Sequence, residues 1–189
     1  MTVITTQKVG RFTVKISVDS DPMNPRREFD NLGIIAYTST RYELGDERRT
    51  PEEIDAIMHE TDGSIALCLP VYCYMHGGTA LNTTGFSCPW DSGQSGIIYI
   101  PREALLKEYG AINDETLAKA TALLKAEVER FSQFLGGEIY GYVVEDADGD
   151  EVDSCWELYG HDYALGEGVA AATECEAEAV RADARAADA

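Results

Sequence analysis

A repeat of apolar residues at steps of three and four, from Leu117 to Leu135, limits the fold of this chain more than any other feature. This spacing places the side chains on one face of an α-helix. Asn113 or Asp114 is placed to cap the first turn, and Gly136-Gly137 to end the helix. Because an apolar stripe has to be buried, we expect the helix to pack on a sheet. The repeat consists of Leu117, Ala120, Leu124, Val128, Phe131 and Leu135.

Several short segments have the composition or the alternation of β-strands. Two further helices are predicted, one starting at the capping-box pattern Thr50-Pro51-Glu52-Glu53 and ending near Glu60, the other over Pro101–Tyr109. The last two strands flank the Gly-containing turn Ala147–Asp150, which predicts a hairpin. The predicted strands are residues 11–18, 31–38, 65–74, 97–100, 138–146 and 151–160.

These elements predict an α+β fold with a mainly antiparallel sheet packed by two or three helices, and with an acidic C-terminal hairpin. We expect a single α+β domain over residues 1–168. Ten of the last twenty residues are Ala, and the other residues there are mostly charged. Since such a segment has little apolar surface to bury, residues 169–189 are predicted to be a frayed helix or a disordered tail.

The charge of the chain restricts its partners. It carries 34 Asp and Glu against 15 Lys and Arg, a formal net charge of −19. Nucleic acids and anionic lipids are held mainly by Lys and Arg, so direct binding to either is not expected, and a cationic partner fits better. Residues 138–168 contain no Lys or Arg. The acidic residues there are Glu138, Glu145, Asp146, Asp148, Asp150, Glu151, Asp153, Glu157, Asp162 and Glu167.

Three interpretations of this acidity compete. The first is a solubilising surface, resembling the low-lysine proteins of saline cytoplasm. The second is calcium binding by an EF-hand loop, whose first, third, fifth and twelfth places would be Asp146, Asp148, Asp150 and Glu157. However, the sixth place of that loop needs Gly and is Glu151 here, and the flanking segments resemble strands rather than helices. The third is mimicry of a nucleic-acid backbone, for which the partner-binding residues would be Glu145, Asp146, Asp148, Asp150, Glu151, Asp153 and Glu157.

Segments at the N-terminus and the cysteine pattern suggest the cellular context. Residues 1–10 lack the basic flank and the apolar run of a secretory signal, so a cytoplasmic location is expected. The five cysteines are an odd set without a CxxC pair, which favours reduced thiols. The three histidines are scattered, and no zinc or nucleotide-binding motif is present, so no metal site and no cofactor is predicted.

One segment concentrates reactive side chains. Between Cys73 and Gln94, Cys88 and His76 form the only plausible pairing of a nucleophile with a base, with Asp91 or Gln94 as the orienting group. No protease signature surrounds Cys88, and closeness in sequence does not establish geometry. Cys88, His76 and Asp91 are therefore weak catalytic candidates, and we expect a binding protein rather than an enzyme.

Short motifs along the chain resemble a group of small uncharacterised proteins encoded by bacteriophages, prophages and related mobile elements. The motifs are FDNLG at 29–33, RYELGD at 41–46, LPVY at 69–72, FSCPWDSGQ at 86–94, IY at 98–99, DSCW at 153–156 and YG at 159–160. The resemblance covers roughly residues 28–163 and carries over no catalytic residue. It implies a phage accessory protein.

Small acidic phage proteins are often inhibitors of host defences that bind nucleic acid, of the anti-CRISPR or antirestriction type. This context and the polarised charge predict an inhibitor whose carboxylates occupy the DNA- or RNA-binding groove of a CRISPR effector or restriction enzyme. Two alternatives stay open. One is an enzyme that uses Cys88 and His76 on a small substrate, and the other is an accessory protein whose acidity is only solubilising.

Overall fold

The computed structural model describes residues 2–88 and 90–187. Within these residues the chain divides into two compact units. Unit 1 combines residues 1–23 with residues 137–189, and unit 2 consists of residues 24–136. The sequence predicts a single domain over residues 1–168. The strand over residues 12–18 pairs on one side with residues 3–9 and on the other with residues 140–145, near the far end of the chain, so this hairpin belongs to a sheet separate from that of residues 24–136.

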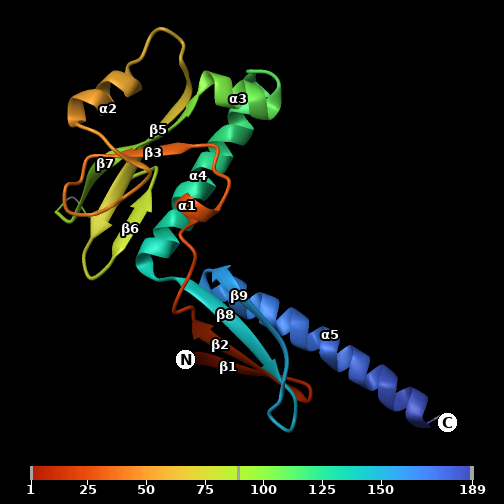
Figure 1. Ribbon diagram of the computed structural model, residues 1–189. Helices are drawn as coiled ribbons and strands as arrows, with labels where there is room; N and C mark the ends of the chain where they lie inside the picture. The colour runs from red at the N-terminus through yellow and green to blue at the C-terminus, as the bar shows by residue number, and fades with distance from the viewer. Residues whose placement is uncertain (1, 89, 188–189) are drawn as a thin grey trace. The chain divides into compact units, whose positions relative to one another are not determined.

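Unit 1 is a four-stranded antiparallel sheet covered on one face by a long helix (Figure 1). The strand order is β1-β2-β8-β9. The buried core between sheet and helix includes Val14, Ile16 and Val144. Its elements are β1 (Val3–Val9), β2 (Phe12–Val18), β8 (Ile139–Glu145), β9 (Glu151–Tyr159) and α5 (His161–Ala187).

Small residues allow α5 to lie close to this sheet. Ala164, Gly168 and Ala172 recur at steps of four and are all buried. A Cβ atom at Gly168 would lie 2.7 Å from Val14 Cγ1, so the helix axis approaches the sheet as closely as glycine permits. Residues 169–187, expected as a frayed helix or a tail, continue α5, and only residues 180–187 are exposed throughout.

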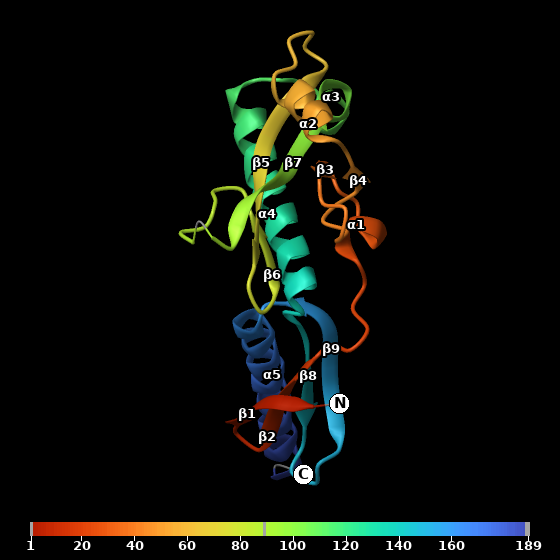
Figure 2. The ribbon, with the colours of Figure 1, turned by 90° about the vertical axis from the view of Figure 1, so that its left-hand side faces the viewer.

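Unit 2 is a five-stranded sheet of order β4-β3-β7-β5-β6 with helices on both faces (Figure 2). All pairs are antiparallel except β3 with β4. The larger core, which includes Ile98 and Leu124, lies under α4, and a smaller one around Ile97 and Ile54 lies under α2. The elements are α1 (Pro25–Glu28), β3 (Ile34–Tyr37), β4 (Glu47–Arg48), α2 (Pro51–Met58), β5 (Ile65–Met75), β6 (Thr79–Asn82), β7 (Ser92–Pro101), α3 (Arg102–Tyr109) and α4 (Asp114–Gly136).

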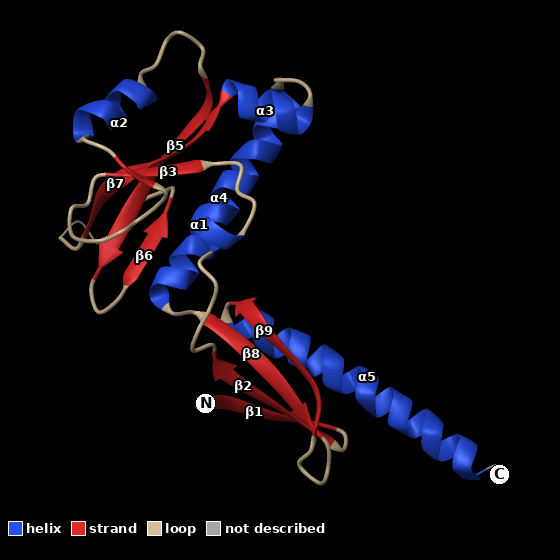
Figure 3. Cartoon of the chain, in the orientation of Figure 1, coloured by secondary structure: helices blue, strands red, loops and turns tan. Residues whose placement is uncertain are grey.

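The nine strands and five helices of the described residues confirm the predicted α+β class, and most strand pairs are antiparallel as expected, in two sheets rather than one (Figure 3). The helix predicted from the Leu117–Leu135 repeat is α4. The capping box predicted at Thr50 and Glu53 begins α2, with both of its hydrogen bonds present. None of the helices among the described residues combines the length and apolar character needed to cross a lipid bilayer.

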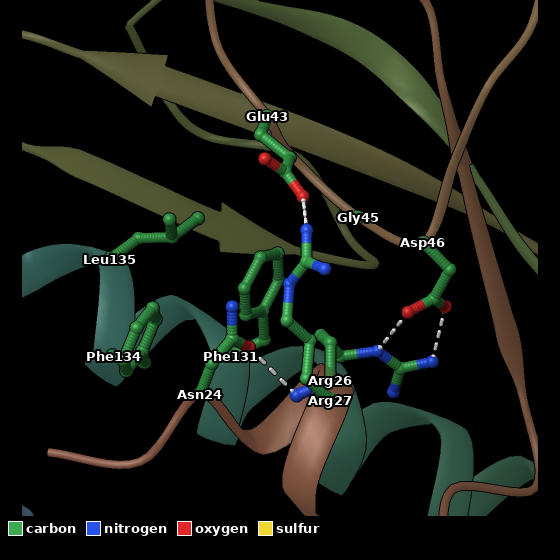
Figure 4. A pocket seen from close by; sticks show the side chains of 9 residues that line it. All are labelled: Asn24, Arg26, Arg27, Glu43, Gly45, Asp46, Phe131, Phe134 and Leu135. Atoms are coloured by element: carbon green, nitrogen blue, oxygen red, sulfur yellow. Dashed lines mark hydrogen bonds and ion pairs between the residues drawn. The ribbon is translucent and has the colours of Figure 1, made fainter.

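A buried arginine connects the irregular first part of unit 2 to α4. The Arg26 side chain is 3% exposed, and all five of its N–H groups donate hydrogen bonds. Nε and one terminal nitrogen donate to Asp46, as Figure 4 shows, and the remaining bonds reach Glu127, Asn31 and the Gly33 carbonyl. Burial alone lowers the pKa of Arg26, but the hydrogen bonds to Asp46 and Glu127 outweigh it, so the net pKa is raised.

Replacement of Arg26 by Ala is expected to lower the free energy of unfolding by about 3–5 kcal/mol, because it leaves the buried Glu127 carboxylate without its counter-charge. Urea denaturation measures the change. Arg27→Ala is the matched control, since the Arg27–Glu43 pair is exposed and its loss should cost about 0–1 kcal/mol. Equal effects of the two substitutions would contradict a central role for Arg26.

Candidate functional site

An acidic groove lies between the edge strand β9 and helix α5 in unit 1. It has a volume of about 440 Å³. Its acidic side chains are Asp153 from β9 and Glu167, Glu174 and Glu178 from α5. The other lining residues are Tyr142, Val152, Ala170, Ala171 and Cys175. We call this hollow the acidic groove.

The three glutamates of the groove share one face of α5. Their spacings of seven and four residues return to nearly the same direction around a helix of 3.6 residues per turn. At a rise of about 1.5 Å per residue, the Cα atoms of Glu167 and Glu178 are roughly 16 Å apart along the axis. No ion pair among the described residues includes Glu167, Glu174 or Glu178, so their charges are available to a cationic partner.

Two weakly acidic side chains in the groove, Tyr142 and Cys175, have raised pKa values. Burial, together with the Asp153 carboxylate that accepts a hydrogen bond from the phenol at 3.3 Å, raises the pKa of Tyr142 to about 12. The pKa of Cys175 is also raised, first by burial and then by the charges of Asp153 and Glu178. Both shifts have the sign that a concentration of carboxylates produces.

The hairpin between β8 and β9 holds most of the partner-binding residues predicted from the sequence. Asp148, Asp150 and Glu151 are exposed there, and Asp153 faces the groove. Asp146 is used within the turn, where one carboxylate oxygen accepts from the backbone amides of Asp148 and Asp150 at 2.9 Å.

Two of the predicted residues are engaged elsewhere in unit 1. Glu145 pairs with Lys15 at 2.6 Å. Glu157 has a φ of 63° at a bulge in β9, and its Oε1 accepts from the backbone amide of Met23 at 2.6 Å. The structure therefore separates Glu145 and Glu157 from the exposed acidic side chains of the hairpin, Asp148, Asp150 and Glu151.

None of the three α5 glutamates is among the partner-binding residues predicted from the sequence. Glu174 and Glu178 lie in the segment that was expected to be a frayed helix or a tail. The signal that identifies them is their spacing from Glu167, combined with the small residues Ala164, Gly168 and Ala172, which mark the buried face roughly 100° away around the helix.

The weak catalytic candidates do come together in unit 2. Asp91 Oδ2 lies 3.6 Å from Cys88 Sγ and 3.6 Å from His76 Nδ1. The carboxylate thus stands between the thiol and the imidazole, whereas a Cys–His catalytic pair needs the imidazole next to the thiol. The His76 side chain is 72% exposed, and the Gln94 amide donates to Met58 and Gly96 instead.

A second hollow, of about 340 Å³, lies beside Arg26 and is the pocket shown in Figure 4. Its charged groups are paired with each other: Arg26 with Asp46, and Arg27 with Glu43. No group of three or more His, Cys, Asp and Glu side chains in the described part of the chain is arranged to hold a metal ion.

Comparisons of the chain with protein-family models, curated proteins and solved structures find no match.

Neutralising the groove should make the Cys175 thiol more reactive. In an Asp153→Asn/Glu178→Gln variant the pKa of Cys175 falls, so more thiolate is present at pH 8 and iodoacetamide reacts faster. Mass spectrometry of the labelled peptides measures the rate at each cysteine. Cys88, in unit 2, is the internal control and should react at an unchanged rate, while Cys68, whose pKa burial raises to about 11, should stay unlabelled. An unchanged Cys175 rate would show that the carboxylates do not act on the groove.

Proposed function

We propose that the protein is an inhibitor that binds a basic, nucleic-acid-binding host defence protein through the acidic surface of unit 1. This surface consists of the acidic groove and the hairpin residues Asp148, Asp150 and Glu151. The observation that carries the proposal is the row of carboxylates on α5 and β9, which no Lys or Arg of the described residues neutralises.

The charge balance of the two units supports this choice of surface. Residues 1–23 and 137–189 contain 17 acidic and 5 basic residues, against 17 and 10 in residues 24–136. Two of the five basic residues in unit 1 already pair within it, Lys15 with Glu145 and Arg11 with Glu176 and Asp183. A surface with one sign of charge attracts a cationic cleft over a Debye length of about 8 Å at physiological salt and repels nucleic acid.

The class of partner follows from chemistry and from the resemblance to phage proteins. Proteins that grip DNA or RNA do so with Lys and Arg arranged to meet successive phosphates. A rigid row of carboxylates offers such a protein an alternative set of anionic groups. For a phage accessory protein, the corresponding targets are a CRISPR effector or a restriction enzyme, whose nucleic-acid groove the inhibitor would block without chemistry.

The proposal is tested by capture from a bacterial lysate that contains CRISPR and restriction systems, with washes at low and high salt. We expect a nucleic-acid-binding defence complex to be retained at low salt and released at high salt. The purified complex should then bind either this protein or its DNA or RNA, but not both at once. Simultaneous binding of the inhibitor and the nucleic acid would refute occupation of the groove.

Removal of three groove charges should abolish this competition. The variant Glu167→Gln/Glu174→Gln/Glu178→Gln is expected to bind the defence complex at least about tenfold more weakly, because exposed glutamates on one helix face are lost while the helix is kept. The matched control is Glu103→Gln/Glu108→Gln/Glu129→Gln, which changes the net charge equally with exposed residues of unit 2. Equal weakening by both variants would mean that net charge alone matters, as a merely solubilising surface requires.

A second candidate function rests on the contacts of Asp91. Because this carboxylate meets both Cys88 and His76, an enzyme acting on a small substrate is the alternative. Cys88→Ala and His76→Ala would abolish the biological effect in that case and leave it unchanged if the acidic surface is responsible. The two functions are therefore separated by variants in different units.

A further inference from the structure

The first half of β7 has an edge that no other described strand occupies. β7 pairs with β5 from Ser92 to Pro101, whereas β3 pairs with β7 only between Gly96 and Tyr99. The last bonds on the β3 side run from the backbone amide and the hydroxyl of Thr38 to the Ser95 carbonyl, the first at 2.9 Å. Beyond that point β3 has ended, so the edge of residues 92–94 is open.

Two grooves meet at this open edge, one on each face of the sheet. The first, of about 470 Å³, is on the α4 side, since Leu44 and Cys73 belong both to its lining and to the core under α4. The second, of about 370 Å³, is on the α2 side, where α2 contributes Ile54 and Met58. Thr38, Gln94 and Ser95 line both grooves.

Large apolar side chains are exposed around the same edge. Trp90 is 92% exposed, and Met75 on the α4 side and Met58 on the α2 side are 38% and 40% exposed. Exposed Trp and Met beside a hollow are typical of binding surfaces, because such side chains lose water readily and adapt to a partner.

We propose that the edge of Ser92–Gln94 and its two grooves are a peptide-binding site, at which an extended segment of a partner protein adds to the sheet as a strand next to β7. In a strand, successive side chains point to opposite faces. A segment placed at this edge therefore directs one side chain into the groove under Trp90 and Met75, and the next into the groove beside Met58. The backbone bonds supply affinity, and the two grooves supply selectivity.

The lining residues define the chemistry of this segment. The grooves contain Met75, Trp90, Ile54 and Met58, so two adjacent apolar side chains fit them. Neither lining contains Lys or Arg, and the carboxylates present are Asp55 and Asp91. Charge complementarity thus favours Lys or Arg on either side of the apolar pair and disfavours Asp or Glu. The open residues 92–94 correspond to a bound stretch of about 10 Å.

This site is independent of the acidic surface of unit 1. It lies entirely in unit 2 and depends on backbone pairing and apolar contact. A failure of the peptide site would leave the proposed inhibition untouched, and loss of inhibition in the α5 variant would leave the peptide site intact.

The first test uses a full-length Trp156→Phe protein, in which Trp90 is the one remaining tryptophan of the sequence. The probes are octapeptides with two adjacent central apolar residues, flanked by Lys in one set and by Asp in the other. We expect members of the Lys set to bind and shift the emission of Trp90, and the Asp set to bind at least about tenfold more weakly. Absence of binding throughout the Lys set would overturn the proposal.

The second test asks whether a bound peptide forms a strand. Alternate amides of a strand point to the same side, so the best peptide is made in two N-methylated forms, methylated on one or the other set of alternate residues. Only the form that keeps its amides toward β7 should bind, and it should slow amide hydrogen exchange within residues 92–94. Equal binding of the two forms, or unchanged exchange at those residues, would refute strand addition.

Variants locate the site. Met58→Glu should weaken binding of the Lys-flanked peptide at least about tenfold by filling the α2-side groove with a charged side chain that resists burial. Leu106→Glu is the matched control, because Leu106 on α3 is also 40% exposed but lies outside both grooves. Loss of binding in the Leu106 variant as well would place the peptide elsewhere.

Discussion

The arrangement of unit 2 depends on the buried guanidinium of Arg26, whose five donors reach acceptors that are distant in sequence. Asp46 and Glu127 do more than balance this charge. Asp46 also accepts a hydrogen bond from the Ile35 amide at 2.7 Å, and Glu127 accepts one from the Leu32 amide at 2.8 Å. Both carboxylates therefore hold the backbone at the start of β3.

The Arg26 network explains residues of the two motifs FDNLG and RYELGD, since Asn31, the Gly33 carbonyl and Asp46 are all acceptors for the guanidinium. A Cβ atom at Gly33 would lie 2.3 Å from Leu124 Cδ2, which explains the glycine. At its other end β3 stops at Tyr37, which leaves residues 92–94 of β7 without a neighbour on that side.

Local chemistry in the sequence was sufficient to predict individual elements. The apolar repeat predicts α4, the Thr50 capping box predicts the start of α2, and Gly110, in the left-handed conformation, ends α3 at the expected position. Pro70, within the predicted strand 65–74, favours a bulge or an edge because proline has no amide N–H to donate. β5 pairs with β6 only from Tyr72 onward, and its pairing with β7 shifts between Val71 and Tyr72, so the proline lies where a missing amide is tolerated. Each of these features is determined by residues close together in the chain.

Pairings between distant residues were not predictable in the same way. Nothing in the alternation of residues 12–18 indicates that β2 pairs with β8, so the two units were expected as one domain. The low apolar content of the Ala-rich segment predicts a frayed helix or a tail. However, Gly168 and its small neighbours allow a close helix–sheet contact that large side chains would prevent. The acidic hairpin was visible as composition. The acidic groove could not be predicted from composition, because it forms only where α5 and β9 lie side by side. Composition also does not indicate that Glu145 and Glu157 have partners inside unit 1.

The insertion of unit 2 into unit 1 affects the order in which the protein can form during translation. The amide of Asp19 donates to the Ile139 carbonyl at 2.8 Å, so the chain leaves the first sheet and returns to it at adjoining positions. β1 and β2 emerge from the ribosome first, yet β8, the neighbour of β2, follows only after all of unit 2. At ~5–20 residues per second, β2 spends on the order of 10 s with an unpaired edge. Unit 2 is continuous in sequence and can fold during that interval, while the strongly acidic helix α5 docks last. A nascent chain therefore displays its peptide-sized grooves before it acquires most of its negative charge.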